Sequence, residues 1–155
     1  MELGQLLGRF EKTANKLSEK FNDNQIAKIV SSFFAEVGAD NLHLFPAYLR
    51  SKGFSQEIYL LAHWESVMAQ LVDMTVTKLP QAQLNPSLHL IELPVDMREL
   101  GICAGTWSLY FYQGQKRNYC LSQKQKEIIE LLSENLILSD DDPEMEELRR
   151  NGIIL

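Results

Sequence analysis

Apolar residues at the start of the chain recur at alternating intervals of three and four residues, with charged residues on either side. The pattern runs through Leu3, Leu7, Phe10, Ala14, Leu17 and Phe21. This spacing is typical of a coiled-coil seam, and it equally fits an amphipathic helix that packs on its own core. The pattern predicts one helix over 1–21. In the coiled-coil interpretation its interface residues are Leu3, Leu7, Phe10, Leu17 and Phe21.

A second amphipathic helix is predicted after the polar triplet "NDN", whose side chains suit a helix N-terminus. Its apolar residues recur at helical spacing from Ile26 to Val37, and Gly38 stands where a left-handed residue commonly ends a helix. The stretch 42–72 allows two interpretations. In the first interpretation it forms two strands around the turn "RSKGFS", and in the second it forms helices. Propensity favours a helix over 57–71, and Pro46 suits the start of a short helix at 45–50 better than a central strand.

A loop over 75–87 and two strands follow, "SLHLIELPV" and "GICAGTWSLYFY". Strand alternation places Trp107, Leu109 and Phe111 on one face of the second strand, and Thr106, Ser108, Tyr110 and Tyr112 on the other. The Trp107 face is predicted to be core. The tyrosine face either stacks a flat ligand or covers the solvent side of an antiparallel sheet.

"GQKRN" is predicted as a turn, after which Ser122 caps a helix over 123–138. Asp142 and Pro143 then begin a short helix within an acidic, solvated tail over 139–155. The length predicts a single domain over 1–155. Its segments are a helical N-terminal part over 1–38, an α+β core over 39–138 and the tail.

The segments "LPV", "MRELG", "GTWSLYF", "LS" and "QKEIIELLSENL" stand in the order strand end, turn, strand, linker and long helix. In this order they resemble the end of a GAF-type sensory domain, and "FFAEVGADNLHLF" resembles that family's first helix running into its first strand. The resemblance implies an α+β fold, with an antiparallel sheet packed against amphipathic N- and C-terminal helices, and a role in signal transduction. The chain departs from the family's ligand-binding types. It lacks the Cys-His pair that anchors a bilin, the cyclic-nucleotide signature and the cysteine set of the free methionine sulfoxide reductases.

Composition narrows the functional classes. The formal net charge is −6 and no basic cluster offsets it, which argues against a protein that binds nucleic acid through phosphates. No apolar run is long enough to span a bilayer and no signal-peptide pattern opens the chain. Two cysteines are too few for a disulfide framework and fit a reducing compartment. We therefore expect a cytoplasmic protein that binds neither nucleic acid nor membrane.

Candidate chemistry is sparse. His43, His63 and His89 have no metal-ligand spacing, and no catalytic or phosphate-binding motif is present, so we assign neither catalytic residues nor a metal or cofactor. Cys120 is the better thiolate candidate of the two cysteines because Lys116 and Arg117 are near it in sequence.

Two functional hypotheses follow. The first is a non-enzymatic regulatory or interaction protein, which forms a homodimer or binds a protein partner through its amphipathic helices. The alternative is a small-molecule sensor. Its pocket would lie between sheet and helices, lined by Trp64, His63, His89, Tyr110 and Tyr112.

Overall fold

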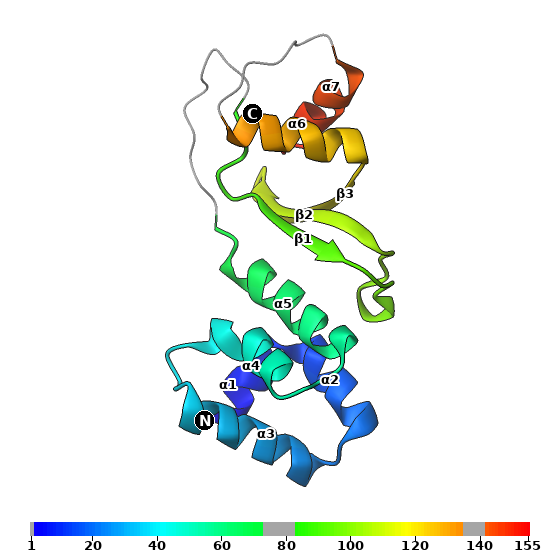
Figure 1. Cartoon of the computed structure of the whole chain (residues 1–155). Coiled ribbons are helices and arrows are strands. Elements are labelled where there is room, and N and C mark those ends of the chain that lie inside the picture. The colour runs from blue at the N-terminus through cyan, green and yellow to red at the C-terminus, as the bar shows by residue number, and fades with distance from the viewer. Residues whose placement is uncertain (1, 73–82, 135–141) are drawn as a thin grey trace. The chain divides into compact units, whose positions relative to one another are not determined.

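The computed structural model describes residues 2–72, 83–134 and 142–155, and it divides into two compact units (Figure 1). Unit 1 comprises Met1–Gln70 and Met97–Ile102, and unit 2 comprises Leu71–Asp96 and Cys103–Leu155. The segment 97–102 lies between two strands of unit 2 in sequence yet packs with the helices of unit 1. The chain therefore passes between the units three times, which the predicted segments 1–38, 39–138 and 139–155 did not anticipate.

Unit 1 is helical. Its elements are α1 (Glu2–Arg9), α2 (Glu11–Lys20), α3 (Asp23–Glu36), the 3₁₀ helix η1 (Leu42–Leu44), α4 (Phe45–Ser51), α5 (Gln56–Gln70) and the 3₁₀ helix η2 (Arg98–Leu100). The rings of Phe10 and Phe33 each lie 5.1 Å from the ring of Phe45, which joins α3 and α4 to the α1–α2 junction. The same buried cluster also contains Leu6, Leu17, Ile26, Val30, Tyr48, Leu49, Ile58 and Ala62.

The prediction of one continuous helix over 1–21 is wrong, because the chain breaks between α1 and α2 at Phe10. Phe10 has φ −116° and ψ 51°, outside the helical region. The carboxylate of Glu65 in α5 accepts hydrogen bonds from the backbone N–H groups of Lys12 (3.0 Å) and Thr13 (2.7 Å) and from the Thr13 hydroxyl (2.7 Å). These donors belong to the first turn of α2, so a residue distant in sequence supplies the N-terminal cap.

The second predicted helix is confirmed as α3. Asn22 accepts a hydrogen bond from the backbone of Gln25, whose side chain accepts one from the Asn22 backbone, so the two form a capping box. Over 42–72 the helical interpretation is confirmed and the two-strand interpretation is wrong. Pro46 lies in the first turn of α4, where its missing N–H costs nothing.

Unit 2 contains a three-stranded antiparallel sheet in the order β1 (His89–Leu93), β2 (Gly105–Tyr112), β3 (Gln115–Leu121), followed by α6 (Gln123–Ser133) and α7 (Pro143–Arg150). The predicted α+β class is confirmed. The predicted five-residue turn "GQKRN" is wrong, because β2 and β3 are joined by Gln113 and Gly114 alone. Both have positive φ, 50° and 75°, as in the tight turns that match strand twist.

The tyrosine face of β2 is core, which corrects the prediction that it meets a ligand or solvent. Tyr110 is 1% exposed and packs with apolar side chains from β3, α6, α7 and the end of the chain, namely Leu121, Ile128, Ile129, Met145, Leu148, Ile153 and Ile154. The prediction of a solvated tail over 139–155 fails for the same reason, since four of these residues follow Asp142. Asp142 does cap α7 and Pro143 does begin it, as predicted. Residues 135–141 and 75–82, which include parts of the predicted helix, tail and loop, lie outside the described residues.

A buried polar network joins residues 83–88 to β2 and to the end of the chain. The side-chain NH₂ of Asn85 donates to the carbonyl oxygens of Phe111 and Gly152, both at 2.9 Å, and its oxygen accepts from the N–H and hydroxyl of Ser87. The Ser87 hydroxyl in turn accepts from the Phe111 N–H at 2.8 Å. In the β1–β2 register Ser87 would follow as the partner of Phe111. The side chains of Asn85 and Ser87 thus bond the backbone of β2 just before β1 begins.

Candidate protein-interaction surface

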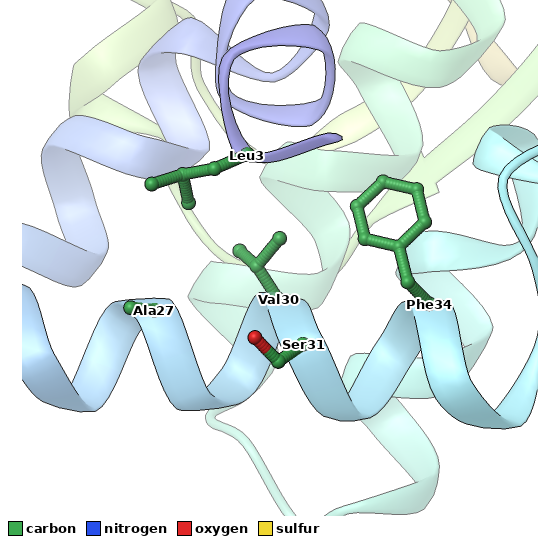
Figure 2. A pocket seen from close by; sticks show the side chains of 5 residues that line it. All are labelled: Leu3, Ala27, Val30, Ser31 and Phe34. Carbon is green, nitrogen blue, oxygen red and sulfur yellow. The ribbon is translucent and has the colours of Figure 1, made fainter. Parts of the chain in front are cut away.

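A hollow lies between α1 and α3 in unit 1 (Figure 2). It has a volume of about 160 Å³ and is lined by Leu3, Ala27, Val30, Ser31 and Phe34. In Figure 2 Leu3 comes from α1 and the other four from α3, with Val30 and Phe34 pointing from α3 toward α1. We call these five residues the α1–α3 hollow.

Helical spacing explains why α3 can form this surface. Ala27, Ser31 and Phe34 follow one another at intervals of four and three residues, so they share a face of the helix beside the buried core residue Val30. The small side chains at 27 and 31 leave the depression. On α1, a Cβ atom added at Gly4 or Gly8 would meet nothing within 4 Å, so this helix presents a smooth backbone surface.

The α1–α3 hollow carries no ionisable side chain, and Ser31 supplies its only polar side chain. Leu3 lies at its edge with 42% of its surface exposed, which makes it one of four large apolar side chains that the structure describes as exposed. The cores of protein interfaces are depleted of charged residues, as this surface is. Pockets for small molecules usually exceed roughly 300 Å³ and contain several convergent polar groups. The hollow therefore suits an apolar side chain of another protein better than a metabolite.

The five residues predicted to face a partner occupy different environments. Phe10 and Leu17 are fully buried in the core of unit 1, and Leu7 and Phe21 are half-buried against the same cluster. Only Leu3 is exposed. The seam of the first 21 residues thus packs mainly on its own core, which was the second of the two interpretations.

The residues predicted to bind a small molecule are divided between the two units. Trp64 is buried and His63 exposed in α5 of unit 1. In unit 2 Tyr110 and Tyr112 pack on the same apolar cluster, where burial raises the pKa of Tyr110 and Arg117 partly offsets this rise. His89 pairs with Leu109 and so lies on the opposite sheet face from Tyr110. The predicted grouping of His89 with the tyrosines is wrong.

The argument for Cys120 as an activated thiolate is not supported by its surroundings. Cys120 lies within β3 rather than at a turn, and burial, followed by the neighbouring Cys103, raises its pKa. Of the two cations named in the prediction, Lys116 and Arg117, the guanidinium of Arg117 lies 5.2 Å from the ring of Tyr112. Among the described residues, no group of three or more His, Cys, Asp or Glu side chains is placed to hold a metal ion.

Segment 97–102 is held in unit 1 by an ion pair. Nζ of Lys16 in α2 lies 2.6 Å from the Glu99 carboxylate, 3.5 Å from Glu19 and 3.6 Å from Glu57. The Lys16 and Glu99 side chains are 15% and 22% exposed, so water screens this pair less than a surface pair. The hydrogen bond to Lys16 lowers the pKa of Glu99 below its ordinary value of 4.5, and the same bond raises the pKa of Lys16 above 10.5.

This pair makes the stability of unit 1 depend on pH. A carboxylate whose pKa is lowered by folding stabilises the fold above its unfolded pKa, and the contribution is lost as pH falls through the folded pKa. We expect the difference in melting temperature between the unmodified chain and Glu99→Gln to be constant from pH 7 to about 5, to shrink as pH falls below 4.5, and to vanish once the pH lies below the lowered pKa of Glu99 in the folded protein. Thermal unfolding by circular dichroism at a series of pH values measures it. A difference in melting temperature that is as large at pH 3 as at pH 7 contradicts the claim that the Lys16–Glu99 ion pair stabilises unit 1.

Comparisons with known proteins leave the family open: no protein-family model matches the chain, and no curated protein matches it either. The likeness to GAF-type sensory domains therefore stays a prediction. In the part of the chain that the structure describes, no helix has both the length and the apolar character needed to cross a membrane.

The residues missed by sequence reasoning are Ala27 and Ser31. Both interrupt the apolar stripe of α3 with small side chains at a spacing of four, and this is the signal that could have found them. A small residue on a helix is also common on ordinary surfaces, so the position of α1 is needed to make it part of a hollow.

Proposed function

We propose that this protein is a cytoplasmic, non-enzymatic regulatory protein that self-associates through the α1–α3 hollow. The observation that carries the proposal is the exposed side chain of Leu3 at the edge of an uncharged apolar depression. A protruding apolar side chain next to a depression is self-complementary, which is what a two-fold symmetric dimer requires.

The proposed dimer places Leu3 of each copy in the hollow of the other. The volume of about 160 Å³ is well above the roughly 10–15 Å³ that one water molecule needs, so the hollow accommodates the four carbon atoms of a leucine side chain. Full burial of a leucine contributes about 1.5–3 kcal/mol, and symmetry doubles it. A dissociation constant of 1 mM corresponds to about 4.1 kcal/mol, and association also costs rotational and translational freedom, so we expect a weak dimer with a dissociation constant in the high-micromolar to millimolar range.

Two neighbouring serines of α3 provide a matched test. Ser31 lines the hollow and Ser32 does not, and both are exposed, so glutamate at either position leaves the core of unit 1 intact. We expect Ser31→Glu to weaken dimerisation by about 100-fold, since it buries an unpaired carboxylate in the interface. Ser32→Glu is expected to associate as the unmodified chain does.

Sedimentation equilibrium of the three proteins over a concentration series measures this difference, and circular dichroism establishes that each variant is folded. If both glutamate variants dimerise equally, or lose association equally, the α1–α3 hollow is not the interface.

A further inference from the structure

The two cysteines of the chain lie close together in unit 2 although they are distant in sequence. Cys120 is in β3, and its partner in the β2–β3 register is Trp107. Cys103 precedes β2, and its carbonyl oxygen accepts a hydrogen bond from the indole Nε1 of Trp107 at 2.9 Å. Directly paired residues project from the same face of a sheet. The Cys120 side chain and the Cys103 backbone therefore border the same indole ring.

Gly105 gives a second measure of this proximity. A Cβ atom built on Gly105 would lie 3.1 Å from Sγ of Cys120, so the thiol of Cys120 lies over the Gly105 backbone. Gly105 is two residues after Cys103, a separation of at most about 7 Å between Cα atoms. Any larger residue at 105 would occupy the space beside the thiol, and glycine leaves it open.

Both cysteines are free, and both are exposed residues. Each is thus accessible to a dissolved oxidant. The two cysteines are also close enough to interact electrostatically, because Cys103 adds to the rise in the pKa of Cys120 that burial causes. This rise lowers the thiolate fraction of Cys120 and makes it a weaker first nucleophile than an ordinary thiol.

We propose that Cys103 and Cys120 form a redox-modification site that a two-electron oxidant of the peroxide class converts to an intramolecular disulfide. The Cys103 thiolate attacks one oxygen of hydrogen peroxide and the O–O bond breaks, which gives a sulfenic acid and a hydroxide ion; the hydroxide takes up the proton that the Cys103 thiol released and becomes water. The Cys120 sulfur then attacks the sulfenic sulfur and expels a second water. Two thiols are oxidised and one peroxide is reduced to two waters, so the step balances.

The position of Cys103 gives such a bond a structural consequence. Cys103 is the first residue of unit 2 after the segment Met97–Ile102, which belongs to unit 1. A bond to β3 fixes the backbone of unit 2 at the residue where the chain returns from unit 1. Oxidation would therefore add a covalent link within unit 2, at a site separate from the α1–α3 hollow of unit 1.

The test oxidises the full-length chain with a small excess of hydrogen peroxide at low protein concentration, followed by alkylation and intact mass measurement. We expect the loss of two hydrogen atoms, no alkylation, a disulfide-linked peptide pair containing Cys103 and Cys120, and reversal by dithiothreitol. Cys103→Ser and Cys120→Ser each remove the partner, and these variants are expected to add oxygen or form linked dimers instead.

Two alkylated thiols after peroxide treatment, or stepwise addition of oxygen to both cysteines with no linked peptide, overturn the proposal. As a control, the protein is reduced with dithiothreitol and alkylated without peroxide treatment. Both cysteines must then be alkylated, which shows that the thiols are accessible in the reduced protein.

Discussion

Replacing Asn85 with aspartate is expected to lower the free energy of unfolding of unit 2 by about 3 kcal/mol or more. Asn85 is 6% exposed, and its NH₂ group donates to two backbone carbonyl oxygens, those of Phe111 and Gly152. Aspartate has the same shape but places an acceptor oxygen, negatively charged when ionised, against both carbonyls. The two carbonyls lose their donors at a site with little access to water, and the new oxygen repels them. Both effects lower the free energy of unfolding.

Asn118→Asp is the matched control, because Asn118 is an exposed residue of β3 in the same unit. A substitution at an exposed position of this kind is expected to change the free energy of unfolding by no more than about 0.5 kcal/mol. Urea unfolding followed by the fluorescence of Trp107, in a Trp64→Phe background for all proteins, reports on unit 2. Equal midpoints for Asn85→Asp and Asn118→Asp contradict a structural role for this network.

Gly152→Ala is the second change with a large expected effect, a loss of about 2–5 kcal/mol in the stability of unit 2. Gly152 has φ +83°, where an L-residue costs roughly 1–2 kcal/mol. In addition, an added Cβ would lie 2.2 Å from Cγ of Tyr112 and 2.4 Å from both Cδ atoms of its ring. These atoms are at the base of the ring, so the whole side chain must move, and overpacking of this kind costs about 1–3 kcal/mol more.

Gly114→Ala separates these two costs. Gly114 has φ +75° in the β2–β3 turn, and a Cβ there meets nothing within 4 Å. It therefore carries the backbone cost without the overlap. In the same urea titration, the free energy of unfolding of Gly152→Ala should be lower than that of Gly114→Ala, by the cost of the overlap with Tyr112. Equal losses for the two variants would show that Tyr112 does not pack on Gly152.

Local signals in the sequence predicted much of the fold. The helix starts at Asn22, Ser122 and Asp142 were all found from their capping side chains, because a cap acts within four residues of the chain. The helices of 42–72 were left open, since α5 buries residues on most of its circumference and shows little amphipathic contrast.

The remaining errors come from contacts between distant residues. Glu65 caps α2 across 53 residues and so divides the first predicted helix at Phe10. The tyrosine face of β2 is covered by α6, α7 and the end of the chain, and alternation along one strand does not reveal which face will be covered. The same holds for the candidate site. Leu3 was found from its spacing, whereas Ala27 and Ser31 join it only through the packing of α1 beside α3.

The central claim is self-association of unit 1, and sedimentation equilibrium of the unmodified chain from low micromolar to millimolar concentration tests it most directly. The account predicts a mass that rises with concentration from the chain mass of 17.8 kDa toward twice that value. A mass of 17.8 kDa at every concentration would contradict it.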